Sequence, residues 1–425
     1  MHEIVDTEIP LRRFEAFPRL GLLLGGALVG LGVVAFVVAV GQDAERAWRA
    51  YLVNWLYFTS IAQGGVILGA AMVITKAIWA RPVRRIAISM VAFLPVAFVL
   101  MLPILVAAEH IFPWVHEPVP AKQAYLNVPF MATRVLVGVG ALFMLSLVFA
   151  YWALRPDAGL LKANGHARGG IIDFLTRRWQ GQEVEEARAT RKLSRLAPVL
   201  VLVFAAGMSF VAWDFVMSLE PEWWSTLIGP YFFMAAFLGA VAATAIGAAF
   251  YRRRFGLEEI IQPPHLHDLG KLTFGFCVFW AYLFFSQYIV IWYGQLPIEQ
   301  DFVIHRLEPP FKWLSVAVLF GLFVVPFFGL LGVAPKKNPL ILIGAAIVVL
   351  VGLWIERYLL VYPSFYHGAS DAPLGWQELG IALPFAGLFS LALAWMATHF
   401  PVVQLWEPLW EPELEERPDA FLTAS

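Results

Sequence analysis

The sequence is poor in cysteine and in charged residues. It has one cysteine, Cys277, among 425 residues, which excludes an internal disulfide, a cysteine-based zinc site and an iron–sulfur cluster held by this chain alone. Only 14% of the residues are charged, whereas soluble domains carry about 25%. The formal net charge of −1 gives no sign of a nucleic-acid partner. We therefore expect a protein whose surface is largely out of contact with water.

Histidine is missing from the middle of every long apolar segment. The nine histidines lie at the ends of these segments or between them, so none stands where a membrane-bound b-type haem needs its ligands. The CxxCH motif, the P-loop and zinc-ligand spacings are also absent. We therefore expect no tightly bound metal or haem in this chain, and any centres for electron transfer in partner subunits.

Long apolar runs dominate what is present, and 60% of the residues are hydrophobic. A helix needs about 20 mostly apolar residues to cross a bilayer. The segments of that kind are 18–40, 51–76, 85–108, 127–153, 197–218, 224–250, 271–294, 312–334, 339–362 and 377–399. The first run is too long for the apolar part of a cleavable signal. The sequence predicts an all-α integral membrane protein with about ten transmembrane helices.

Lysine and arginine are distributed unevenly between the two sides of the predicted membrane domain. With the N-terminus inside, 23 of the 30 lie in inner segments and 5 in outer ones. Cytoplasmic loops carry the excess of positive charge. We therefore predict cytoplasmic tails at 1–17 and 401–425, a membrane domain at 18–400 and an amphipathic inner loop at 155–196. Within that loop, 171–178 is predicted to lie as a helix on the membrane surface, or else to dock another subunit.

Two of the predicted helices share a weak pattern. In the fifth and the ninth, a carboxylate precedes a proline by seven residues, Asp214 before Pro221 and Glu356 before Pro363. A repeat at this spacing predicts two four-helix bundles, helices 2–5 and 6–9, flanked by helices 1 and 10. A chance likeness between two proline-ended helices is the alternative.

Charged residues inside the predicted spans are the first candidate site. A charge in the membrane is costly, so it usually faces the bundle interior and pairs or acts. The outer candidates, about 8–10 Å below the outer ends of their helices, are Arg134, Asp214, Glu356 and Arg357, with Glu109 just outside this layer. They form either a buried network that fixes helix register or a site for a proton or a quinol head group.

The pairing within this layer follows from helix geometry. Adjacent residues on a helix point about 100° apart, so we do not expect Glu356 and Arg357 to pair with each other. We expect an arginine, Arg134 or Arg357, to reach a carboxylate of another helix, and all four side chains to form one network.

Two further groups of candidates lie on or before the seventh helix. On the inner side, proton entry is suggested by His265, His267, Asp268 and Lys271, because histidine titrates near neutral pH. The alternative is that Asp268 is an N-cap and Lys271 follows the inner excess of positive charge. Farther along, the possible quinone contacts are Tyr282, Ser286 and Gln287. For most of the aromatic rings around them, helix packing and the aromatic belt of the membrane interface are the better explanation.

Four runs of residues resemble a known family. They are FVMSLEPEWWST at 215–226, HLHDLGK at 265–271, FWAYLFFSQY at 279–288 with IWY at 291–293, and WIERY at 354–358. They look like the second quinone-binding membrane subunit of bacterial quinol:cytochrome c oxidoreductase, the alternative complex III. The chain is similar, more distantly, to NrfD and polysulfide-reductase membrane subunits, which share the Glu-Arg pair. The resemblance covers most of the chain from helix 2 to helix 10.

The resemblance implies a location in the bacterial inner membrane and specific partners. These are a multihaem cytochrome c subunit, an iron–sulfur subunit of the molybdopterin-enzyme type and a homologous NrfD-like subunit. It also implies oxidation of menaquinol or ubiquinol near the outer face. The homologous subunit is the better candidate for the quinol pocket, which leaves proton conduction or a structural role for this chain.

Three functional hypotheses follow. The leading one is a membrane subunit of a respiratory quinol-oxidising complex that contributes to quinol oxidation, proton conduction or both. The second is a secondary ion-coupled transporter, whose charged residues would bind substrate near the midplane of the membrane, whereas those found here lie toward one face. The third is a scaffold in which the charges serve only specificity.

Overall fold

The computed structural model describes residues 9–166, 170–365 and 374–407. Across these ranges the chain forms helices joined by turns and contains no strand. Ten of the helices in the described ranges are long and apolar enough to cross a membrane. The predicted fold class is confirmed, and the chain is a multi-pass, all-α membrane protein.

The spans follow one another along the chain with short connections. The first two spans are α1 (Arg19–Gln42) and α2 (Ala44–Ile74), and the third consists of η1 (Ile78–Ala80), α3 (Arg81–Ser89), η2 (Met90–Phe93) and α4 (Leu94–Val106). The fourth to seventh spans are α6 (Val128–Ala163), α8 (Gln182–Phe215) with η5 (Met217–Leu219), α9 (Ile228–Phe255) and α10 (Pro263–Gly294). The eighth consists of α12 (Lys312–Leu319), the π-helical turn η6 (Phe320–Val324) and α13 (Val325–Gly329), and the last two are α15 (Pro339–Val361) with η7 (Tyr362–Phe365) and α16 (Trp376–His399). The shorter elements between spans are α5 (Ala108–Ile111), η3 (Pro113–Val115), η4 (Pro120–Lys122), α7 (Gly170–Leu175), α11 (Pro297–Leu307) and α14 (Val333–Lys337).

Several helix ends are fixed by local side chains. A helix satisfies its backbone polar groups internally, as the bilayer requires, except at its first and last turns. The Asp43 side chain accepts a hydrogen bond from the Arg46 amide at 3.0 Å, and the Asn127 side chain accepts one from the Phe130 amide at 2.9 Å. These N-caps start α2 and α6. Gly256 ends α9 with φ 62°, a left-handed conformation that costs little only in glycine.

The centre of the molecule is formed by α2 and α9. In the most apolar 18-residue stretch of α2, 78% of the residues are buried, and in that of α9, 67% are. The corresponding stretch of α1 is only 17% buried. Gly64 of α2 faces α9 so closely that a Cβ there would lie 2.5 Å from the carbonyl oxygen of Ala236. Small residues permit this approach of two backbones. Around this axis α2 packs with the third span and α8, and α9 packs with α10 and α15, which gives the two predicted four-helix bundles.

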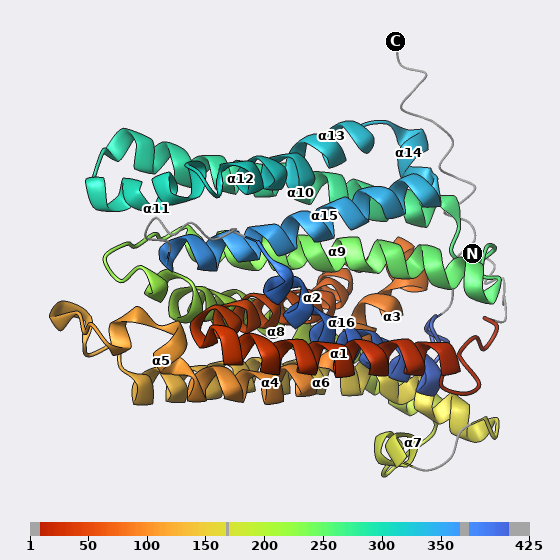
Figure 1. Cartoon of the computed structure of the whole chain (residues 1–425). Coiled ribbons are helices and arrows are strands. Elements are labelled where there is room, and N and C mark those ends of the chain that lie inside the picture. Colours follow the sequence, from red (N-terminus) through yellow and green to blue (C-terminus); the bar gives the residue numbers. More distant parts are fainter. Residues whose placement is uncertain (1–8, 167–169, 366–373, 408–425) are drawn as a thin grey trace.

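The flanking helices α1 and α16 form one pair. They pack along each other, and α16 also contacts α2 and the third span (Figure 1). Gly32 lies against Pro384, where a Cβ would stand 2.0 Å from the proline Cδ. Both flanking helices therefore lie beside the first bundle.

The two ends of the molecule differ in the elements that cover them. One end carries α5 and α11, and the other carries α7 and α14 (Figure 1). The segment before α1 and the segment after α16 meet at the α7 end, where the Phe14 amide donates to the Ala397 carbonyl at 2.8 Å and the Val402 amide donates to the Arg12 carbonyl at 3.0 Å. Following the distribution of lysine and arginine, we call the α7 end inner and the α5 end outer.

The predicted inner loop at 155–196 is mostly helical. α6 continues ten residues past its predicted end at 153, to Ala163, and α8 begins at Gln182. Between them, α7 covers only part of the predicted surface helix at 171–178. The Arg155 guanidinium holds this region together, because it donates to Glu185 at 2.7 Å and to the Leu175 carbonyl.

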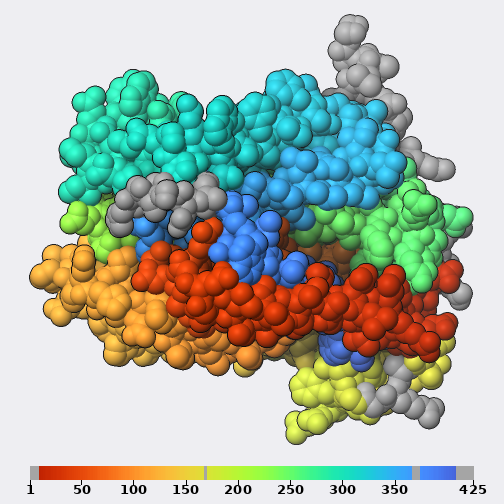
Figure 2. All heavy atoms as spheres, viewed as in Figure 1, coloured from red at the N-terminus to blue at the C-terminus, as the bar shows by residue number. Residues whose placement is uncertain are grey.

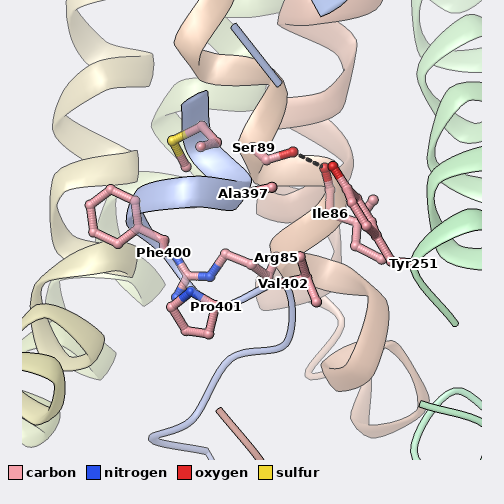
Figure 3. Close-up of a pocket in the computed structure, with 9 residues that line it drawn as sticks. Arg85, Ile86, Ser89, Tyr251, Ala397, Phe400, Pro401 and Val402 are labelled. Atoms are coloured by element: carbon pink, nitrogen blue, oxygen red, sulfur yellow. Dashed lines mark hydrogen bonds between the residues drawn. The ribbon is translucent and has the colours of Figure 1, made fainter. Parts of the chain in front are cut away.

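Residues 401–407, predicted as part of the C-terminal tail, pack against the inner end. Glu407 pairs with Arg84, and the Leu405 amide donates to Asp157 at 2.9 Å. Asp157 also pairs with Arg85, which extends from α3 toward the segment at 400–402 and lines a crevice of ≈ 10 Å³ there (Figure 3). That volume is about one water molecule, so the segment closes the inner end of the first bundle rather than leaving a cavity.

Candidate functional site

Asp214 is held by two side chains of the first bundle. It lies in the last turn of α8, is 1% exposed, and accepts hydrogen bonds from Arg134 Nη2 at 2.6 Å and Arg134 Nε at 3.0 Å. The Tyr125 hydroxyl donates to the same carboxylate at 3.0 Å, and the Arg134 guanidinium lies 3.7 Å from the centre of the Tyr125 ring. Burial and the negative charge of Asp214 raise the pKa of Tyr125, which remains a donor. The predicted pairing of Arg134 across the first bundle is therefore present.

Glu356 and Arg357 form a buried pair in the second bundle. Arg357 Nη1 lies 2.8 Å from Glu356 Oε2, so the prediction that these neighbours on α15 would not pair is wrong. Their long side chains bend toward each other, and this overcomes the angle between the two Cβ directions. Arg357 Nη2 also donates to the Phe232 carbonyl at 3.0 Å, and the guanidinium lies 3.9 Å from the centre of the Phe232 ring. This anchors the pair to α9.

One oxygen of Glu356 differs from the other carboxylate oxygens of this layer. Oε1 is buried and has no well-formed hydrogen bond among the described residues, although the Tyr231 hydroxyl interacts with the same carboxylate. Tyr231 lies between Glu356 and Trp280 and interacts with both side chains without a well-formed hydrogen bond to either. The ring centres of Tyr231 and Trp280 are 5.9 Å apart. A buried acceptor left unpaired costs about 1–3 kcal/mol. The carboxylate is therefore able to accept a proton, or a hydrogen bond from a water or a ligand.

The two pairs do not form the single network that the sequence predicted. Asp214 and Arg134 belong to the first bundle, whereas Glu356 and Arg357 belong to the second. No hydrogen bond or ion pair connects one pair with the other within the described ranges. Each bundle thus has its own buried pair toward the outer end.

The sequence analysis missed a buried arginine on α11. The Arg306 guanidinium donates to the Leu359 carbonyl at 2.9 Å, to Glu220 at 3.0 Å and to the Ser364 hydroxyl at 3.0 Å. It also lies 3.4 Å from the centre of the Phe302 ring. Burial lowers the pKa of Arg306, and Glu220 opposes that shift. The only signal in the sequence was that Arg306 is a basic residue in an outer segment, where lysine and arginine are few.

A second missed group joins three helices at the outer end. Glu378 of α16 is 1% exposed and accepts hydrogen bonds from Arg46 Nε of α2 at 2.7 Å and from the Tyr362 hydroxyl at 2.8 Å. The Gly375 amide donates to it at 2.7 Å. Glu378 stands three residues after Gly375, the spacing of a capping box, and this was the available signal. Every oxygen of this carboxylate is satisfied, so its role is to hold helices together.

A cleft of ≈ 560 Å³ opens at the outer end between the two bundles. Its walls are α5 with η3 on one side and α11 on the other, and Figure 2 shows these segments, orange and teal, at the same end of the molecule. The ionisable residues lining it are Glu45, Glu109, Glu117, Glu220, Glu222, Asp301, His110, His116, His305 and Arg49. Glu109 is thus a wall residue of this cleft and not part of either buried pair. In the described ranges no three of these side chains are placed to hold a metal ion.

The candidate quinone contacts do not enclose a site. Tyr282 is 61% exposed on α10, and Ser286 and Gln287 are half-buried on the same helix. None of the three lines the outer cleft. A head-group site buries most of its ligand, so these residues by themselves offer a quinone only a surface.

The inner candidates belong to the first turns of α10. The helix begins at Pro263, eight residues before its predicted start at 271, so the expectation that Asp268 is its N-cap is wrong. His265 Nδ1 accepts a hydrogen bond from the Gln262 amide at 2.9 Å, which caps the helix, and Asp268 pairs with Lys271 at 2.5 Å. His267 is half-buried beside them. The structure thus gives His265 and Asp268 local structural partners.

Comparison with known proteins finds no family that matches the chain and no similar curated protein. The case for a function therefore depends on the residues and their geometry. The strongest feature is the contrast between the fully bonded carboxylates Asp214 and Glu378 and the partly bonded carboxylate Glu356.

Proposed function

We propose that this chain is a membrane subunit of a respiratory quinol-oxidising complex in the bacterial inner membrane, with both termini cytoplasmic. Its contribution is to accept and pass on protons near the outer face. The observation that carries this proposal is Glu356, a buried carboxylate with one oxygen bound by Arg357 and the other without a well-formed hydrogen bond beside Tyr231. The resemblance of the four sequence runs to subunits of alternative complex III supports it.

The chemistry of quinol oxidation explains why such a group is needed. A quinol gives up two electrons and two protons when it becomes a quinone. In the proposed complex the electrons go to haem or iron–sulfur centres of partner subunits, because this chain has one cysteine and no histidine within the apolar core of a span. The protons need an acceptor. Arg357 holds Glu356 through Oε2, which leaves Oε1 to take a proton.

The two rival functions fit the geometry less well. A secondary transporter binds its substrate near the midplane, whereas Glu356 lies five residues before the outer end of α15 and Asp214 lies in the last turn of α8. A pure scaffold needs only satisfied ion pairs, as at Glu378. A scaffold would have no use for a Glu356 oxygen that lacks a well-formed hydrogen bond.

The test is the Glu356→Gln variant in the assembled complex. Glutamine keeps the shape of the side chain but cannot carry the proton as a carboxylic acid does. We expect quinol oxidation per haem, or proton release where it is measured, to fall by about tenfold or more, because a positioned proton acceptor contributes about 10²–10⁴ in rate. Assembly yield should change little.

Glu378→Gln is the matched control. Because Glu378 is a bonded structural carboxylate, this change should lower assembly yield and leave turnover per assembled complex unchanged. Normal turnover and normal proton release in assembled Glu356→Gln and Asp214→Asn complexes would refute the proposal. Purification of the chain alone, with neither haem absorbance nor iron–sulfur signals, would equally contradict it.

A further inference from the structure

The lipid-facing stripe of α8 ends in two basic residues at the inner end. Val199 and Leu202 are exposed on this helix. Side chains three, four or seven positions apart share one face of a helix, so Arg195 and Lys192, which are also exposed, continue the same stripe. Along the helix axis Arg195 lies about 6 Å and Lys192 about 10 Å beyond Val199. The two cations therefore lie where the apolar part of a bilayer gives way to its head groups.

The neighbouring helix α6 brings aromatic rings to the same level. Its exposed stripe runs through Met144 and Val148 to Trp152, four residues farther on. The Lys192 ammonium lies 5.8 Å from the centre of the Trp152 ring, which joins the stripes of α6 and α8. Tyr151 stands beside Trp152, with 5.2 Å between ring centres. Tryptophan and tyrosine gather at the head-group level of membranes, so both helices mark the same depth.

The short helix α7 adds a third cation at this level. It protrudes sideways from the bundle at the inner end, beside α6 (Figure 1), and the yellow segment that contains it stands out from the body of the molecule in Figure 2. Phe174 of α7 is exposed, and its ring centre lies 6.0 Å from that of Tyr151. The Arg177 guanidinium, in the turn after α7, lies 5.3 Å from the centre of the Phe174 ring. Exposed aromatic and basic side chains in this position are typical of a helix that lies on a membrane surface.

We call this region between α6, α7 and α8 the inner corner. It consists of Tyr151, Trp152, Phe174, Arg177, Lys192 and Arg195.

The described chain does not neutralise the three cations of the inner corner. Arg177, Lys192 and Arg195 form no ion pair with any described residue. Asp173 of α7 and Glu185 of α8 already pair with other basic residues. The remaining acidic residues of α8 before the membrane lie on its first two turns, farther from the apolar part of the helix: Glu183 and Glu186. The inner corner therefore presents net positive charge at the membrane surface.

An anionic phospholipid matches both parts of this surface. Its phosphate accepts charge-assisted hydrogen bonds from lysine and arginine, and its acyl chains cover the exposed apolar side chains of α6 and α8. Phosphatidylcholine carries a cation of its own beside the phosphate, whereas phosphatidylglycerol has a net negative charge and is attracted by basic clusters next to a membrane. We propose that the inner corner binds the head group of an anionic phospholipid in the leaflet at the inner end. The proposal does not depend on the proposed function, because it needs only the membrane and these side chains.

The first test places a photo-crosslinking amino acid, benzoylphenylalanine, at Phe174 of the full chain in its native membrane. We expect crosslinks to phospholipid, identified by mass spectrometry, in which the share of anionic lipid is severalfold higher than in the membrane as a whole. In the Lys192→Gln, Arg195→Gln background that share should fall to the composition of the membrane. Crosslinks to another protein would show that α7 docks a partner subunit, and would overturn the proposal.

The second test measures lipid preference directly. The full chain is placed in nanodiscs of equal phosphatidylglycerol and phosphatidylcholine, and the lipids that it retains are counted by native mass spectrometry. Each basic residue near an anionic surface contributes about fivefold in affinity, so the Lys192→Gln, Arg195→Gln variant should lose about tenfold or more of its preference for phosphatidylglycerol. Because both side chains are exposed and form no ion pair, this variant should fold as the unaltered protein does.

The matched control removes two exposed cations from the inner end of the second bundle, Arg253→Gln and Lys337→Gln. It changes the net charge by the same amount and should keep the preference for phosphatidylglycerol. An equal loss in both double variants would show a general effect of positive charge and would refute a site at the inner corner. An unchanged preference in the Lys192→Gln, Arg195→Gln variant would refute it as well.

Discussion

At the scale of single residues, the number of bonded carboxylate oxygens separates structural roles from chemical ones. Asp214 and Glu378 are buried, and each accepts hydrogen bonds on both oxygens. Glu356 is as deeply buried but accepts a well-formed hydrogen bond on Oε2 alone. A buried oxygen without a hydrogen bond costs free energy. Its presence in the folded protein therefore argues that Glu356 has a chemical role.

Arg306 provides a test of a structural residue at the same scale. Arg306→Lys keeps the charge but removes the planar group that reaches Glu220, Ser364 and Leu359 together. We expect a loss of about 1–3 kcal/mol and faster hydrogen exchange in α11, measured by mass spectrometry. Arg253→Lys, at an exposed position of α9, is the control. Unchanged exchange in α11 would show that this arginine does not anchor it.

The sequence could predict only some of these residue contacts. Arg134 and Asp214 stand out because each is a charge within an apolar span. The pair of Arg46 with Glu378 joins residues 332 positions apart, and that of Arg306 with Glu220 joins residues 86 apart. All four lie near span ends, where a charge is ordinary. No local pattern marks such partners.

At the scale of helices, close contact depends on glycine. Gly25 and Gly32 of α1 face α16, and Gly387 of α16 faces the backbone of α1. A Cβ at any of these positions would meet an atom of the other helix within 2.7 Å. Helix pairs in membranes associate through van der Waals contact at such small residues.

The matched variants Gly32→Ala and Gly30→Ala test this packing. At Gly32 the new methyl group would overlap Pro384, whereas at Gly30 nothing lies within 4 Å. Overpacking costs about 1–3 kcal/mol, so Gly32→Ala should lower the thermal unfolding temperature in detergent, followed by size-exclusion chromatography. Gly30→Ala should match the unaltered protein. An equal effect of both changes would contradict the close contact of α1 with α16.

Helix boundaries were less predictable than helix number. Hydropathy detects only the apolar part of a helix, so it ended the fourth span at 153 and began the fifth at 197. The helices α6 and α8 run beyond the apolar part, and buried Arg155 and Glu185 pair where they extend past it. Helical polar segments of this kind look like a loop in the sequence.

At the scale of the whole molecule, two bundles joined along α2 and α9 place one buried ion pair in each half and a charged cleft between their outer ends. The carboxylate-to-proline spacing shared by the fifth and ninth helices was enough to predict the two bundles, because these two helices stand four spans apart and each ends one bundle. It could not predict the cleft, since the cleft is lined by connecting segments from both halves.

The orientation of the molecule can be tested with cysteines at two exposed carboxylates. Glu183 lies at the inner end and Glu308 at the outer end, while the native Cys277 is fully buried and should not react. Because the excess of lysine and arginine marks the cytoplasmic side, Glu183→Cys should label only from the cytoplasm. Glu308→Cys should label only from outside. Labelling of both from one side would contradict the topology.

The pairing of α1 with α16 also affects how the protein is made. The ribosome delivers α1 first and α16 last, and chains begin to fold from the N-terminal part during synthesis. In the finished molecule α1 packs mainly on α16 and has only 17% of its apolar window buried. Its main partner therefore does not exist until the eight described spans between them have been translated. We therefore expect α1 to remain largely in contact with lipid while these spans insert, until α16 arrives and packs along it.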